Sequence, residues 1–230
     1  MRTFRIVGAA LLAVNLFMAG CTTLSAAREN SFAEQALSNV KQIRKLTVYV
    51  VYDDPGDLPE FEQTLRLTSD ILKKEIDVEL ELNFSSLQVA WSGRKQNELL
   101  FQLSYLTSPR EREFDIAIGL TKRTASETAE CDQFIRHTGF CWQAGIDNKY
   151  RRFIVMRDFH PWFLAHEIGH VFVFNRLHSK SGLMKPTADQ ADGGGYILKG
   201  DDYSFTKEDR EEALRNKWRT FGRRVDPVTY

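Results

Sequence analysis

Several features that would assign a chain to a class are absent from this sequence or scarce in it. Its 230 residues carry 31 basic and 31 acidic side chains, so no excess of charge favours nucleic acid or an anionic membrane surface as a partner. No internal repeat or low-complexity tract appears. The apolar run from Ile6 to Ala19 is too short to cross a bilayer as a helix. The roughly 200 residues that follow it are enough for one domain with a sizeable core.

The first twenty residues have the pattern of a secretory signal. Arg2 and Arg5 precede the apolar run, and small residues then lead to Cys21. This order resembles a bacterial lipoprotein signal, which implies cleavage before Cys21, a lipid anchor on its sulfur, palmitate as one of the attached groups, and a place in the cell envelope, on the periplasmic or exterior face of the outer membrane. An ordinary secreted protein with a stray cysteine is the alternative. We expect a signal peptide over 1–20, a lipidated tether over 21–45 and a domain over 46–230.

Only two cysteines remain beyond the proposed anchor, Cys131 and Cys141. In an oxidising compartment, an even pair this close in sequence predicts a disulfide, with two free thiols as the alternative. The polar stretch from 121 to 139 is expected to form a long surface loop that the disulfide holds.

Hydrophobic periodicity predicts an α+β domain in which strands and helices alternate. Strands are expected at 46–52, 78–84, 114–120, 140–146 and 151–156, and helices at 61–72, 98–105, from Pro161 onwards and from Thr206 to about Gly222. We expect Leu214, Trp218 and Phe221 to form the apolar stripe of the last helix. The order predicts a mixed, twisted sheet packed against two or three helices.

Three of the five histidines lie close together in the chain, at positions 166, 170 and 178. His166 and His170 belong to an HExxH sequence, which on a helix places both imidazoles on one face, where they can reach a single Zn²⁺. A catalytic zinc needs three protein ligands and one position open to water, so His178 is the expected third ligand. Glu167 lies off the line of the histidines, where it can accept a proton from water without binding the metal.

Residues 166–186 resemble the metzincin clan of zinc peptidases, most closely the matrixin type. The clan pattern is H-E-x-x-H-x-x-G-x-x-H followed by a Met turn, and the resemblance extends over about residues 140–222. It implies that Met184 forms the Met turn, a hydrophobic floor beneath the three imidazoles. It also implies that an edge strand, here Phe140–Ile146, pairs with an extended peptide substrate.

The sequence departs from that pattern at two places. Val173 stands where the pattern has Gly, and His178 follows His170 by eight residues instead of six. We expect the helix to continue through Phe174 and to turn at Asn175, which would return His178 to the metal. The alternative third ligand is a carboxylate of the last helix: Glu208, Glu211 or Glu212.

The resemblance implies a zinc-dependent endopeptidase that acts as a monomer on a peptide or protein. Glu167 would be the general base and would later give its proton to the departing amine. The alternative is a non-catalytic lipoprotein that contains zinc and binds a peptide or protein partner. Glu167 favours the enzyme, because a purely structural zinc site has no use for a general base outside the ligand set.

Overall fold

The computed structural model describes residues 42–83, 86–92, 95–121, 144–174, 178–185, 189–190, 196–197 and 200–222. Strands in these ranges are β1 (Arg44–Tyr52), β2 (Val78–Leu82), β3 (Leu87–Gln88), β4 (Ile116–Leu120), β5 (Ala144–Ile146), β6 (Phe153–Met156), β7 (Asp189–Gln190) and β8 (Tyr196–Ile197). Helices are α2 (Leu58–Ile76), α3 (Gln96–Thr107), α5 (Pro161–Phe172) and α6 (Lys207–Asn216), with short 3₁₀ turns at η1 (Pro55–Asp57), η2 (Ser108–Arg110) and η4 (Gly200–Tyr203).

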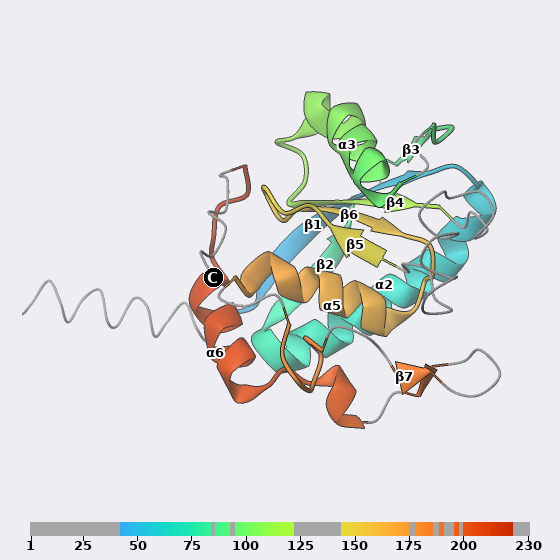
Figure 1. The fold of residues 1–230 in the computed structure, drawn as a ribbon. Helices are drawn as coiled ribbons and strands as arrows, with labels where there is room; N and C mark the ends of the chain where they lie inside the picture. Colours follow the sequence, from blue (N-terminus) through green and yellow to red (C-terminus); the bar gives the residue numbers. More distant parts are fainter. Residues whose placement is uncertain are drawn as a thin grey trace, which may run out of the picture. The chain divides into compact units, whose positions relative to one another are not determined.

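One sheet organises the fold, with strand order β2-β1-β4-β6-β5 and with β3 paired to the end of β1 (Figure 1). All neighbours are parallel except β5, which runs antiparallel to β6 at the sheet edge. Parallel neighbours require crossover connections, and α2 supplies the one between β1 and β2. The mixed sheet predicted from the sequence is therefore confirmed.

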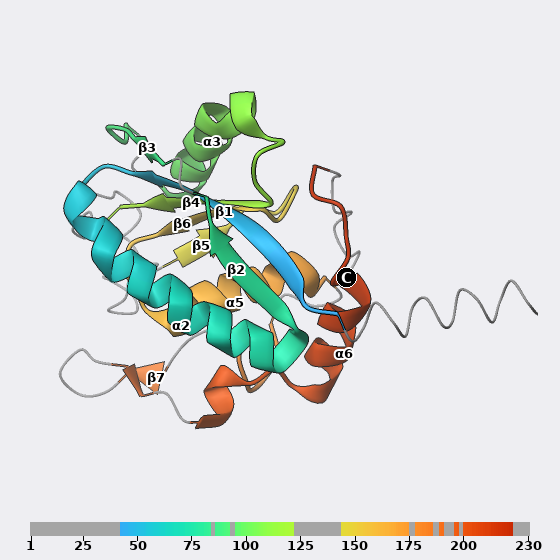
Figure 2. The same cartoon turned by 180° about the vertical axis from the view of Figure 1, so that it is seen from behind.

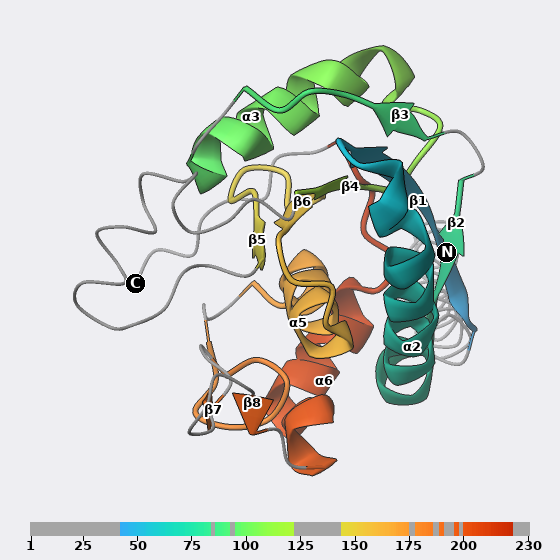
Figure 3. The same ribbon diagram turned by 90° about the vertical axis from the view of Figure 1, so that its right-hand side faces the viewer.

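Helices cover both faces of the sheet, as the views from behind and from the side show (Figures 2 and 3). Side chains alternate along β1: Leu46 and Val48 join the core beneath α2 and α5, whereas Tyr49 and Val51 join the core beneath α3. Because both faces are buried, the strand reads as a nearly continuous apolar run. The α2–α5 layer holds the HExxH sequence.

Two helix ends differ from the prediction. The helix that carries HExxH ends at Phe172 and not at Phe174, because Val173 already has an extended backbone with φ −103° and ψ 113°. Helix α6 ends at Asn216, six residues before Gly222. The expected apolar stripe is therefore only partly present on α6: Leu214 lies in the helix and packs against the core, whereas Trp218 lies beyond the helix and is 43% exposed.

Several predictions fall outside the described residues. These are the signal peptide, Cys21, most of the tether, the Cys131–Cys141 pair and the turn at Asn175. They stay predictions. The described part of the chain starts within the predicted tether, and β1 begins at Arg44, two residues before the expected strand. No helix in the described ranges combines the length and apolar character needed to cross a membrane.

Candidate metal centre

The start of helix α5 is defined by an N-cap residue and a proline at neighbouring positions in the chain. The Trp162 backbone N–H donates to Nδ1 of His160, the N-cap residue, at 3.2 Å. Pro161 occupies the first helical position, where its missing N–H costs nothing. The helix that follows is largely buried, and His166 and His170 are only 5% and 7% exposed. The motif therefore lies inside the protein and not on a solvated helix face.

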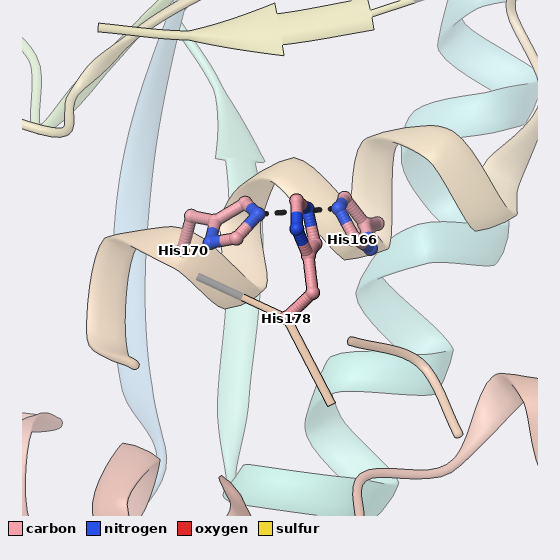
Figure 4. A group of neighbouring side chains, drawn as sticks. All are labelled: His166, His170 and His178. Atoms are coloured by element: carbon pink, nitrogen blue, oxygen red, sulfur yellow. Dashed lines mark hydrogen bonds between the residues drawn. The ribbon is translucent and has the colours of Figure 1, made fainter. Parts of the chain in front are cut away.

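The structure brings the three predicted histidines together (Figure 4). The Nε2 atoms of His166 and His170 lie 3.1 Å apart, and each of the three side chains offers a nitrogen within 4.8 Å of the others. His166 and His170 come from α5, whereas His178 approaches from the segment beyond it. Among the described His, Cys, Asp and Glu residues, this is the group of three whose possible ligand atoms converge.

The His166 ring is oriented by its surroundings. Its Nδ1 lies 2.8 Å from the Leu183 carbonyl oxygen, which can only accept, so Nδ1 carries the proton. Nε2 is then left with its lone pair directed towards His170. The Trp162 ring stacks on the same imidazole with centroids 5.2 Å apart, and its Nε1 donates to the Asp202 carbonyl at 2.8 Å. Such outer contacts fix the tautomer of a metal-ligating histidine.

Burial keeps these imidazoles neutral near pH 7. Desolvation lowers the pKa of His166 to about 4. Desolvation, the neighbouring histidines and the Arg151 charge lower the pKa of His170 to about 2. The pKa of the more exposed His178 is also lowered by desolvation. A histidine binds metal in its neutral form, so the site holds all three side chains in the state that ligation requires.

Glu167 follows His166 on the same helix and lies outside the converging group of nitrogens. Its side chain is half-buried, and desolvation raises the pKa of its carboxyl above the ordinary range. Such a carboxyl is a stronger base than a fully solvated one, and it accepts a proton only in its ionised form.

Met184 is buried and lies directly against α5. A Cβ atom at Gly169 would collide with its Sδ, so the close approach depends on glycine inside the HExxH sequence. The chain reaches Met184 through Gly182, whose φ of +74° is a left-handed conformation. The Ser179 N–H donates to the Met184 carbonyl at 2.8 Å and closes this turn. The contact with Gly169 was not anticipated from the sequence, although a glycine inside a helix is a signal of close packing.

Side chains from distant parts of the chain satisfy the carbonyl end of α5, and none of them was predicted from the sequence. Arg151 Nη1 donates to the carbonyls of His170 and Val173, at 3.2 and 2.6 Å. Asn216 Nδ2 donates to Phe172 O at 2.7 Å, and Arg219 Nη1 to Val171 O at 2.8 Å. These donors explain how the helix ends without the glycine of the metzincin pattern, because carbonyls left without a helical partner need other donors.

The carboxylates considered as alternative ligands lie elsewhere. Glu208 and Glu211 are exposed on α6. Glu212 is buried, but its carboxylate accepts a hydrogen bond from the Phe174 backbone N–H. None of the three belongs to the converging group. The geometry therefore brings His178, rather than a carboxylate of α6, to His166 and His170.

The predicted substrate strand is only partly described. β5 is an edge strand and contacts α5, in agreement with the expected position beside the site, whereas residues 140–143 lie outside the described ranges. The Gln96 side-chain amide donates to the Ala144 carbonyl at 2.9 Å. Pairing of this edge with a peptide stays a prediction.

No protein-family model and no curated protein sequence matches the chain. Solved structures that align with this chain include metalloproteinase-II from Bacteroides fragilis, at 14% identity and a TM-score of 0.46, over 75% of this chain and 53% of that one. Archaemetzincin from Methanopyrus kandleri aligns at 15% identity and a TM-score of 0.47, over 76% and 97%. A chain in the structure of a chaperone–substrate complex aligns at 11% and 0.47, over 75% and 35%. This chain thus spans about half the length of the metalloproteinase-II chain.

Proposed function

We propose that this chain is a zinc-dependent endopeptidase of the metzincin type. The observation that carries the proposal is the convergence of His166 and His170, from an HExxH sequence on a buried helix, with His178 from the segment beyond it. Glu167 follows the first of these histidines in the sequence and is not part of their group, as expected of a general base that does not bind the metal. The conclusion rests on the residues of the site and not on the similarity of fold.

The donor set fits zinc. Neutral imidazole nitrogens are good zinc ligands, and Zn–N distances of about 2.0–2.1 Å in a tetrahedron place two ligand nitrogens about 3.3 Å apart. The 3.1 Å between the Nε2 atoms of His166 and His170 agrees with that spacing. His178 lies within 4.8 Å and would complete three protein ligands. Met184 would pack beneath them, since a thioether is a poor zinc ligand.

The reaction proposed is hydrolysis of a peptide bond. When bound, Zn²⁺ acidifies a water molecule and polarises the scissile carbonyl. Glu167 would accept the proton of that water and then donate it to the departing amine. The edge strand β5 would hold an extended substrate through backbone hydrogen bonds.

We also propose that a lipid on Cys21 anchors the chain in the bacterial envelope, and that it acts there as a monomer on peptides or proteins. Support comes from the resemblance of residues 1–21 to a lipoprotein signal. Mass spectrometry of the membrane fraction would identify the lipidated residue, and Cys21→Ser should release the chain from that fraction. A soluble chain that begins elsewhere and is unaffected by Cys21→Ser would contradict the anchor.

Replacing Glu167 by glutamine separates catalysis from metal binding. Glu167→Gln keeps the size of the side chain but cannot accept a proton, so cleavage of a peptide library should slow by about 10²–10⁴-fold while the zinc content stays at the wild-type level. Glu62→Gln, at an exposed position on another helix, is the matched control and should cleave at the wild-type rate.

Three outcomes decide between the functions. A large loss in Glu167→Gln alone supports the enzyme. Equal rates at equal zinc content would remove Glu167 as the base. Zinc-loaded wild-type protein that cleaves no unstructured peptide would favour the non-catalytic lipoprotein that binds a partner.

A further inference from the structure

A row of polar side chains on α6 contacts the segment that joins the HExxH helix to His178. We propose that this row (Asp209, Glu212 and Asn216), together with Arg219 just beyond the end of the helix, positions His178 for metal binding, and we call the four residues the α6 polar stripe. The inference rests on the proposed function and deepens it, since it assigns positioning residues to the same metal site. None of the four residues is proposed to contact the metal or a substrate.

The contacts follow the chain in order. From the start of α6 onwards, Asp209 accepts from the Ser179 hydroxyl and Glu212 accepts from the Phe174 N–H. Asn216 then donates to Phe172 O at 2.7 Å, and Arg219 to Val171 O at 2.8 Å. The positions 209, 212 and 216 follow the i, i+3, i+7 spacing of one helix face. One face of α6 therefore contacts both the end of α5 and the residue after His178, and the ribbon shows the two helices meeting (Figure 1).

The two carboxylates are buried, so losing their hydrogen bonds should lower the stability of the folded protein. Asp209 is fully buried and Glu212 is 4% exposed. A buried carboxylate is unfavourable unless hydrogen bonds compensate for its lost hydration. Asp209 accepts from the Ser179 hydroxyl and from the Thr206 hydroxyl of its own helix cap, and Glu212 accepts from the Phe174 N–H. Phe174 precedes His178 in the chain and Ser179 follows it. The carboxylates thus hold the chain on both sides of His178.

The stripe also accounts for the departure from the metzincin pattern. A glycine after the helix would allow a left-handed turn that satisfies the last carbonyls within the chain. Val173 is extended instead, so α6 and Arg151 supply the hydrogen-bond partners from outside. If His178 were not held in this way, zinc binding would have to fix its position, and the zinc affinity would fall by the entropy of that ordering.

The test is the zinc dissociation constant of the full chain, measured by competition with a chelator and compared with thermal stability. Glu212→Met removes the acceptor for the Phe174 N–H, and the dissociation constant should rise by about 10–100-fold, the range typical of losing a residue that orients a metal ligand. Glu212→Gln keeps an oxygen that can accept, and should bind zinc within about threefold of wild type. Arg152→Met is the matched control, because Arg152 is also buried and donates to backbone carbonyls, but to those of Phe114 and Asp115 and not to the residues around His178.

If Glu212 only stabilises the fold, Glu212→Met and Arg152→Met should both have lower thermal stability, and both folded proteins should bind zinc with the wild-type affinity. That result would overturn the proposal. Loss of zinc in Glu212→Gln as severe as in His178→Ala would overturn it too, since it would make Glu212 a ligand. If Glu212→Met does not fold, Asn216→Ala provides the test, and an unchanged dissociation constant refutes positioning. Absence of zinc binding in the wild type would instead refute the proposed function itself.

Discussion

The two ends of α5 are completed in opposite ways. At its start, His160 and Pro161 provide the cap and the first turn from adjacent positions in the chain. At its end, the carbonyls of residues 170–173 meet Arg151, Asn216 and Arg219, which are 19, 44 and 48 residues away from the groups that they contact. The start of the helix is therefore a local property of the sequence, whereas its end is a property of the folded protein.

The proposed metal ligands show the same difference between local and long-range determinants. His166 and His170 are placed by the helical repeat alone, four residues apart on one buried face. His178 is placed by the contacts that Phe174 and Ser179 make with α6. A metal site can therefore combine ligands that are predictable from the sequence, such as the helical pair His166 and His170, with a ligand such as His178 whose position depends on contacts with residues far away in the chain.

Removing the ligands tests this division most directly and has the largest expected effect. His166→Ala and His170→Ala should each abolish tight zinc binding, because two remaining ligands hold the ion poorly. His178→Ala should weaken binding strongly but leave the helical pair. Zinc content after dialysis against a chelator measures this. His160→Asn, which removes an imidazole but retains an acceptor at the N-cap, is the control and should bind normally.

A different ranking would change the assignment of ligands. Full zinc content in His178→Ala, together with loss of zinc in a variant of Glu208, Glu211 or Glu212, would transfer the third ligand to α6. The site would then no longer consist of a helical pair of histidines and a third histidine held by contacts with α6.

Removing a hydrogen-bond donor at the end of α5 should lower the free energy of unfolding more than any change at the start of the helix. Arg151→Ala removes the donor to the carbonyls of His170 and Val173, both in the protein interior. It also removes a cation from the negative end of the helix dipole. We expect a loss of about 2–3 kcal/mol in the free energy of unfolding, measured by urea in the presence of a chelator. A loss below about 1 kcal/mol would show that Asn216 and Arg219 are sufficient.

What the sequence could reveal about this fold follows from how local each signal is. The apolar run of β1 and the helical spacing of His166 and His170 are local patterns, and the structure has both elements where they were expected. The end of α5 was placed two residues too late, because the donors that terminate it lie in other elements. Similarly, Glu212 and Asn216 resemble solvated residues of a polar helix, and only the packing of α6 shows that they contact the site.

Gly169 is the point where the rigid helix meets the turn that follows His178. Replacing glycine by alanine inside a helix normally stabilises it by about 1 kcal/mol. Here the new methyl group would collide with Met184 Sδ and approach Phe205, so overpacking should outweigh that gain. We expect Gly169→Ala to lower the free energy of unfolding by about 1–2 kcal/mol, whereas Gly200→Ala, with open space around it, should be nearly neutral. A stabilised Gly169→Ala would mean that Met184 moves aside without cost.

The smallest expected effect is a pH dependence at the start of α5. Burial lowers the folded-state pKa of His160, with Asp158 opposing the shift. Because the unfolded chain has the higher pKa, near 6.5, it binds more protons below that pH, and stability must fall as the solution is acidified through this range. Protonation of His160 also removes the acceptor for the Trp162 N–H and places a positive charge at the positive end of the helix dipole.

Comparison of wild type with His160→Asn isolates this contribution, because the other histidines titrate in both proteins and cancel in the difference. Between about pH 8 and pH 5.5, wild type should lose up to about 1 kcal/mol more unfolding free energy than His160→Asn, the amount typical of a lost N-cap. Urea titrations of both proteins at the two pH values measure it. An identical pH response would show that His160 does not contribute as a cap, and that Pro161 and the packing of Trp162 alone begin the helix.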